Sequence, residues 1–301
     1  MADSSTYKQY VETYTDSLRL LAQQQPSRFR NAVSVQSVKG EGVAFLETIA
    51  PSEAQEVTTR YADKVNIEQT HNRRWAHPRK FEWGAMVEDL DKLKMNIELN
   101  GPYTRQGNFA INRTIDDELV SKFFATSLIG RSGGDSVAFP TGTNVVAVTE
   151  GAGAATGMNV DKLLAAREII LGNEVDIDDP MNKMYCAISA AQERNLLEQV
   201  KIVNKDYQDQ AVLSGGGTSL KEWFGINFIL TERLDVDSNS YRRNPFWCMS
   251  GMGLGIWRDV TTDVVQNTTI TGNPFHVTVN AVFGATRLEE EKVVEIKCSE
   301  A

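Results

Sequence analysis

The chain has few of the residues from which metal sites and disulfide frameworks are built. Its 301 residues include three histidines and three cysteines. His71 and His77 lie six residues apart without Cys, Asp or Glu at ligand spacing, and His276 is remote from both. Because a structural or catalytic metal needs three or four such ligands, we expect no metal site.

The cysteines are odd in number and far apart, so they do not indicate a disulfide framework. We expect the chain to fold reduced, inside a cell. Cys186 lies in a predicted strand and is expected to be a small core residue. The three positions are Cys186, Cys248 and Cys298.

Positive charge and long apolar runs are also scarce. The net charge is -9, which argues against a general nucleic-acid binder but not against a container whose inner wall tolerates DNA. No run approaches the roughly 20 apolar residues of a membrane helix. The first residues, M-A-D-S-S-T-Y-K, have no apolar core for a signal peptide, so we expect a protein made in the cytoplasm.

Catalytic motifs are weak throughout. Ser189 and Ser214 lack a nucleophile elbow, and the glycines of residues 215–217 are not followed by the Lys-Ser/Thr of a phosphate loop. The strongest candidate is the glycine-rich turn over residues 151–157, between a predicted strand at 145–148 and a predicted helix at 160–171. Strand, glycine turn and helix can cradle a pyrophosphate, but G-x-G-x-x-x-G is one residue longer than the dinucleotide fingerprint. No catalytic residue and no cofactor is predicted, and a nucleotide-dependent enzyme using residues 151–157 is the alternative function.

The clearest element is a helix predicted over residues 112–130. Ile115, Leu119 and Phe123 lie on one apolar face, and we expect Gly130 to end the helix. Asp116 and Asp117 are interpreted as capping and surface charge on a solvated face.

The first third of the chain predicts extended structure. Apolar side chains recur at helical spacing in residues 2–25, and we expect an amphipathic arm there. This arm either packs on its own domain or reaches a neighbouring subunit. Period-two alternation from Val33 predicts strands, and residues 71–83 are basic and aromatic. We expect a projecting hairpin that docks on another protein surface. The predicted inter-subunit contacts are Arg73, Arg74, Trp75, Arg79, Lys80 and Trp83.

The rest of the chain mixes both kinds of element. Helices are predicted at 87–100 and after Ser189, and strands at 184–188 and 223–230 and in the region 260–298. No linker divides this pattern, which indicates an α+β or α/β fold.

A succession of short segments resembles the major capsid proteins of tailed double-stranded DNA bacteriophages, which have the Hong Kong 97-type capsid fold. The resemblance covers about four fifths of the chain and rests on the order of the segments. They are T-T-R-Y-A-D (58–63), T-H-N-R-R-W (70–75), R-T-I-D-D-E-L-V (113–120), V-D-K-L-L-A-A-R-E-I-I-L (160–171), Y-C-A-I-S (185–189), N-L-L (195–197), K-D-Y (205–207), W-F-G-I-N-F-I-L-T-E-R-L (223–234) and G-A-T-R-L-E-E-E-K-V-V-E-I (284–296).

The resemblance implies an α+β fold with defined parts. Residues 1–38 would be the N-terminal arm and 39–90 the region of the extended hairpin, or E-loop. A peripheral domain would cover 91–157, with a spine helix at 113–130. An axial domain would cover 158–257, and 258–301 would return as strands to the peripheral domain.

The implied function is structural: a non-enzymatic subunit that self-assembles into hexamers and pentamers of an icosahedral shell around double-stranded DNA. Its localisation would be the virion, after assembly in the bacterial cytoplasm. Because only about forty residues precede the hairpin, we expect a separate scaffolding protein or none. A portal and a decoration protein are the other implied partners, and a small homo-oligomeric binding protein is a third hypothesis.

Overall fold

The computed structural model describes residues 23–40, 43–49, 52–56, 58, 64, 66–69, 71–87, 102–199, 220–267, 269–270 and 274–300. The expected helices at 2–25 and 87–100 lie wholly or mainly outside these residues. So do the K-D-Y segment, the triple-glycine segment and most of residues 57–67, which belong to the region where alternation predicts strands. None of the described helices has the length and apolar character that a membrane crossing requires.

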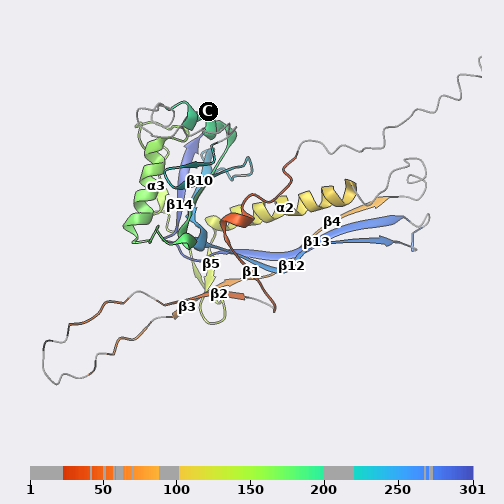
Figure 1. Cartoon of the computed structure of the whole chain (residues 1–301), viewed down its shortest axis with the longest axis horizontal. Helices are drawn as coiled ribbons and strands as arrows, with labels where there is room; N and C mark the ends of the chain where they lie inside the picture. Colours follow the sequence, from red (N-terminus) through yellow and green to blue (C-terminus); the bar gives the residue numbers. More distant parts are fainter. Residues whose placement is uncertain are drawn as a thin grey trace, which may run out of the picture.

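One long helix covers one face of a four-stranded sheet (Figure 1). The sheet has the order β1-β12-β13-β4. Its strands are β1 (Ser34–Ser37), β12 (Met252–Gln266), β13 (Phe275–Arg287) and β4 (Arg79–Val87), and the helix is α2 (Pro102–Phe123). We call this assembly the α2 unit.

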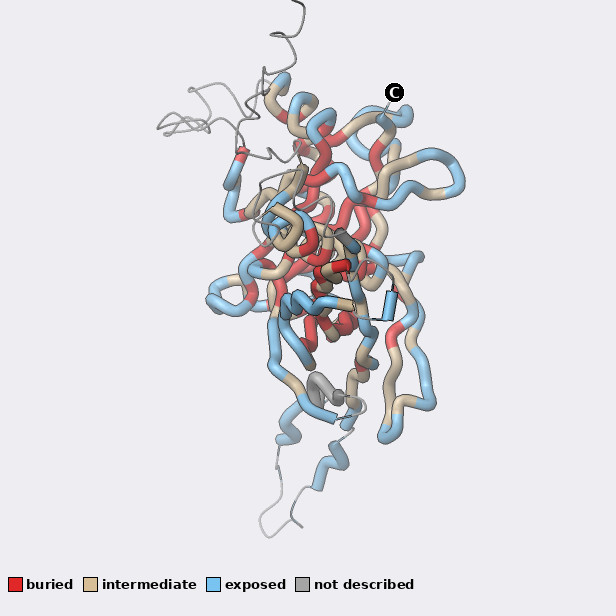
Figure 2. Tube along the Cα trace, turned by 90° about the vertical axis from the view of Figure 1, so that its right-hand side faces the viewer, coloured by how far each residue is buried: buried red, intermediate tan, exposed pale blue. Residues whose placement is uncertain are grey.

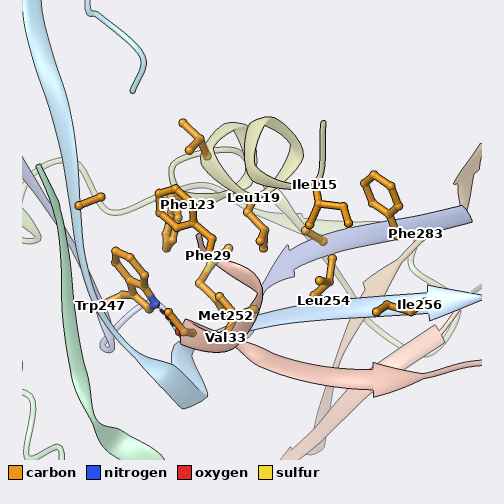
Figure 3. Close-up of a cluster of buried hydrophobic side chains, with 14 of the residues drawn as sticks. Phe29, Val33, Ile115, Leu119, Phe123, Trp247, Met252, Leu254, Ile256 and Phe283 are labelled. Carbon is orange, nitrogen blue, oxygen red and sulfur yellow. Dashed lines mark hydrogen bonds between the residues drawn. The ribbon is translucent and has the colours of Figure 1, made fainter. Parts of the chain in front are cut away.

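The core of the α2 unit follows from the spacing of apolar residues on α2. Ile111, Ile115, Leu119 and Phe123 recur every fourth residue, so they lie on one face, and all are buried. Figure 3 shows Ile115, Leu119 and Phe123 above the sheet residues Leu254 and Ile256. Phe283 of β13 lies beside Ile115. The short helix η2 (Arg30–Ala32) adds Phe29 and Val33 from its two ends.

A second body is built on a six-stranded mixed sheet of the order β7-β14-β11-β8-β10-β9. We call it the six-stranded unit. Helix α3 lies beside this sheet (Figure 1), and α3, with Leu196 of α4, contributes to a second apolar core. Its elements are β7 (Val145–Val146), α3 (Val160–Gly172), η3 (Pro180–Asn182), β8 (Met184–Ile188), α4 (Ala190–Leu197), β9 (Glu222–Trp223), β10 (Ile226–Leu230), β11 (Tyr241–Cys248) and β14 (Val293–Ser299).

A third sheet, of the order β2-β3-β5-β6, lies at the base of a hairpin. Its strands are β2 (Val43–Ile49), β3 (His71–Ala76), β5 (Ser127–Ile129) and β6 (Asp135–Val137). The described residues between β2 and β3 are all exposed and lie away from both units (Figure 1). Figure 2 shows buried residues gathered in the middle of the molecule and exposed ones along its projecting parts.

The chain enters or leaves the six-stranded unit three times among the described residues. It crosses from β6 to β7, from β11 through η5 (Met249–Gly251) to β12, and from β13 to β14. Trp247 of β11 is fully buried at this junction, where its ring lies 4.7 Å from that of Phe123 and 5.7 Å from that of Phe29. The Trp247 indole donates a 2.8 Å hydrogen bond to the Ala32 carbonyl (Figure 3).

The helix predicted over residues 112–130 is wrong at both ends. Helix α2 begins ten residues earlier, at Pro102, because proline is well suited to a first helical turn, where no backbone N–H is needed. It ends at Phe123 because residues 127–129 pair as β5 with β3. The strand predicted over 223–230 is likewise two strands, with a turn at Phe224 and Gly225 in which both residues have positive φ.

Several local predictions are confirmed. Helix α3 begins after Asn159, whose side chain accepts a hydrogen bond from the Lys162 N–H. Strand β8 occupies 184–188, and Ser189 caps α4 in a reciprocal capping box with Gln192.

Candidate functional site

The basic and aromatic segment at residues 71–83 joins two sheets. Strand β3 pairs with β2 and β5, whereas β4 pairs with β13 in the α2 unit. His77 and Pro78 make the connection between them. The segment is therefore part of the folded body at the base of the hairpin rather than its projecting tip.

Arg74 is tied to the last crossing between the units. Its guanidinium forms a hydrogen-bonded ion pair with Glu290, and both side chains are nearly buried. Glu290 also lies 3.3 Å from the guanidinium of the fully buried Arg287. The Arg287 Nη1 donates to the carbonyls of Phe123 and Ala125, at 2.8 and 2.7 Å, so Arg287 secures the end of α2. Burial lowers the pKa of Arg287, and the neighbouring Glu290 opposes that effect.

The two tryptophans of the segment, Trp75 and Trp83, also make contacts within the subunit. The Trp75 indole donates a 2.7 Å hydrogen bond to the Gly130 carbonyl. Trp83 packs against α2 at Gly107, where an added Cβ would lie 2.6 Å from the Trp83 ring. Gly107 thus lets the helix approach β4 closely.

The remaining cations of the segment are closer to solvent. Arg79 pairs with the buried Glu118 at 2.5 Å, although its own side chain is 57% exposed. Lys80 is 61% exposed and pairs with Glu82 on the same strand, and this hydrogen bond lowers the pKa of Glu82. Arg73 is half-buried and lines a pocket of about 340 Å³ with His71, Gly130 and Arg131.

Asp116 is buried, which overturns its interpretation as a solvated surface charge. Its carboxylate accepts hydrogen bonds from the Ser27 hydroxyl at 2.6 Å and from the Arg28 and Phe29 N–H groups at 3.0 and 3.3 Å. The Gln24 amide donates to it as well. Hydrogen-bond donors of residues 24–29 take the place of water around the Asp116 carboxylate. These hydrogen bonds fix residues 24–29 to α2.

The two acidic residues that follow, Asp117 and Glu118, form ion pairs with other parts of the chain. Asp117, whose side chain is 44% exposed, makes a bidentate ion pair with Arg233, which follows β10 in the six-stranded unit. Hydrogen bonding to Asp117 raises the pKa of Arg233. Glu118, 5% exposed, holds Arg79 at the start of β4.

The glycine turn at 151–157 is held by a buried lysine. The Lys162 ammonium donates to the carbonyls of Thr156, Gly157 and Lys297, at 2.8, 2.9 and 3.1 Å. Burial lowers the pKa of Lys162. A pocket of about 690 Å³ lies beside the turn, but Asp161 and Glu198 line it, so a phosphate would meet negative charge. The turn ties α3 to β14, and its geometry does not favour nucleotide binding.

The cysteines lie in the core of the six-stranded unit. All three are free and buried, and burial raises their pKa values, to about 11 for Cys248 and about 12 for Cys298. Within the described residues, no group of three His, Cys, Asp or Glu side chains is arranged to hold a metal ion.

Five residues with structural roles were not predicted from the sequence: Asp116 as an anchor, Arg233, Glu290, Arg287 and Lys162. Each acts on a partner 87 or more residues away, or on backbone carbonyls, and such pairing leaves no local periodicity. One signal was present for Asp116, because three successive acids at 116–118 are unusual beside an apolar helix face.

Comparison with known proteins gives one consistent result. A family profile described as phage capsid protein matches residues 7–300. The comparison with curated proteins gave no match. Among solved structures, the capsid of cyanophage P-SCSP1u is similar, with 14% identity, 98% of this chain and 94% of that chain covered, and a TM-score of 0.72.

Two further structures show the same fold. The capsid of cyanophage Pam1 has 10% identity over 100% of both chains, with a TM-score of 0.71. A structure from Mycobacterium phage Che8 has 15% identity, covers 95% of this chain and 96% of that chain, and has a TM-score of 0.65. The mixed fold expected from the resemblance, of the Hong Kong 97 type, is confirmed.

Proposed function

The chain belongs to the phage capsid protein family, and on that premise we propose that its copies form rings of six and five that close into an icosahedral shell around double-stranded DNA. The family assigns the chain a structural role as a capsid subunit and gives no support to a nucleotide-dependent enzyme. The match over residues 7–300 carries the proposal.

The shape of the subunit supports assembly through projecting parts. The described residues between β2 and β3 are exposed, which leaves the hairpin available to a neighbouring copy. Head-to-tail contacts of this kind generate closed rings when their rotation closes. Many modest contacts per subunit then act together, because each contact raises the effective concentration for the next.

The six predicted contact residues divide into two groups under this proposal. Arg74, Trp75 and Trp83 support the hairpin base from inside the subunit. Contact with a neighbour would then fall to the cations nearer solvent, which are Arg73, Arg79 and Lys80.

The proposed domains keep the order that the resemblance implies, with adjusted contents: an arm, the hairpin region, a peripheral domain that corresponds to the α2 unit, and an axial domain that corresponds to the six-stranded unit. Assembly in the bacterial cytoplasm, with a separate scaffolding protein, a portal and a decoration protein as partners, belongs to the same proposal. The acidic chain would enclose DNA without binding it tightly to the wall.

The proposal is tested by expressing the chain, alone and together with a candidate scaffolding protein, and analysing it by sedimentation and negative-stain microscopy. Shells, tubes or six-membered rings are expected. A stable monomer or dimer that binds NAD or ATP would contradict the proposal and favour the enzyme.

A further inference from the structure

Three successive carboxylates on α2 tie the helix to three separate parts of the chain. Asp116 holds residues 24–29, Asp117 holds Arg233 of the six-stranded unit, and Glu118 holds Arg79 at the hairpin base. Successive helical residues point about 100° apart, so one turn of helix can serve three directions.

The three ties differ in how easily they can break. Asp116 and Glu118 are 0% and 5% exposed, and separating either from its partners would leave a buried charge without compensation. The side chains of Asp117 and Arg233 are 44% and 39% exposed, so water can solvate both when they part. Within this turn of α2, the bond to the six-stranded unit is the reversible one.

The contact between the two units also contains a buried centre. Trp247 of the six-stranded unit sits among Phe29, Phe123 and Tyr185, with ring centroids 4.7 to 5.8 Å away. The hydrogen bond from the Trp247 indole to the Ala32 carbonyl fixes this centre as a pivot, and the apolar packing around it is less directional than a bidentate ion pair. The junction thus combines an apolar centre with a polar contact at its exposed edge.

We propose that the Asp117–Arg233 ion pair is an adjustable contact that sets the angle between the α2 unit and the six-stranded unit about Trp247. This inference rests on the proposed function, because a shell of five- and six-membered rings places the same chain in two different surroundings. With the pair formed, one angle is favoured; with the pair open, neighbouring angles become accessible at little cost.

The test compares shells assembled from the unmodified chain with shells from Arg233→Gln and from Asp117→Asn. Particle diameters are measured by electron microscopy, and subunit stability is measured by denaturant unfolding. Both variants should fold normally. The ratio of off-size shells and tubes to shells of the main diameter should rise about two- to fivefold, which corresponds to about 0.4–1 kcal/mol at 1.4 kcal/mol per tenfold.

Three comparisons separate a change of the angle between the units from a general loss of charge. The exchanged pair, Asp117→Arg with Arg233→Asp, should restore the main diameter. The matched control is Arg194→Gln, which removes an exposed ion pair between α4 and Glu198, the residue after its end, and should leave the distribution unchanged. Assembly of the unmodified chain at high salt, which screens exposed pairs, should reproduce the broadening, and Arg233→Gln should be insensitive to salt.

The possible failures are distinguishable. Shells of unchanged diameter from both single variants would overturn the adjustable contact alone. Equal broadening in Arg194→Gln would also overturn it. If the unmodified chain forms no shells or rings, either alone or with a candidate scaffolding protein, the proposed function fails and the adjustable contact fails with it.

Discussion

Residues 116–118 show how burial gives adjacent residues of the same charge different roles. Asp116 accepts hydrogen bonds from residues 24–29 and is fully buried. Asp117 pairs with Arg233, and both of these side chains are partly exposed to solvent. Sequence patterns place both on a helix but do not reveal that distant residues cover one of them. Lys162 is a similar case, because a lysine with three backbone carbonyls has no acidic partner that a motif search would find.

The buried thiols give a prediction at the scale of residues. At pH 8, Ellman's reagent should leave Cys248 and Cys298 unmodified in the native subunit and label them after denaturation. Raising the pKa of Cys248 from 9.0 to about 11 lowers its thiolate fraction about 100-fold, and burial blocks access further. Fast labelling of the native protein would contradict the buried placement.

The same shifts fix a direction for pH dependence. Above pH ~9 the unfolded chain loses thiol protons that the folded chain retains until its higher pKa. The thiol contribution to unfolding free energy is therefore fully present below pH ~9 and is lost as the pH rises toward about 11 and 12. Cys248→Ser should weaken this dependence in denaturant titrations between pH 8 and 10.

At the scale of elements, the end of a helix can be predicted when neighbouring residues determine it and cannot when distant residues do. The start of α3 and the capping box of α4 are set by neighbours three residues apart, so the sequence predicts them. The ends of α2 depend on tertiary pairing: β5 forms because β3 lies beside it. Gly107 resembles a helix breaker, yet it is needed for the close approach of Trp83.

The attachment of residues 24–29 to α2 gives a prediction for an element. Asp116→Asn replaces one accepting oxygen with an amide that faces N–H donors. We expect a loss of about 2 kcal/mol in unfolding free energy, because a buried donor is left without an acceptor. Trypsin should also cut after Arg28 and Arg30 faster than in the unmodified chain.

Asp117→Asn is the matched control for that experiment, with an expected loss under about 1 kcal/mol, since its ion pair is exposed. Denaturant unfolding and the time course of digestion measure both quantities. Equal losses in the two variants would show that Asp116 is not the anchor.

At the scale of the whole molecule, the body and the hairpin should be separable in function. Strands β2 and β3 pair up to Ile49 and His71, so an Asn-Gly turn can replace residues 50–70. Because the described residues of that segment are all exposed, the melting temperature should change little. Shell closure should be lost in sedimentation, and normal shells from this variant would refute the role of the hairpin.

The sheet of the α2 unit joins distant parts of the sequence. Strand β1 pairs with β12, and the paired residues Ser34 and Gly253 lie 219 positions apart in the sequence. Such non-local pairing folds slowly, because a large loop must close before the contacts that stabilise it can form. Until β12 and β13 are in place, the apolar face of α2 lacks the sheet that covers it. We therefore expect a late folding step, in competition with aggregation, to limit how many subunits reach the folded state in which copies can assemble.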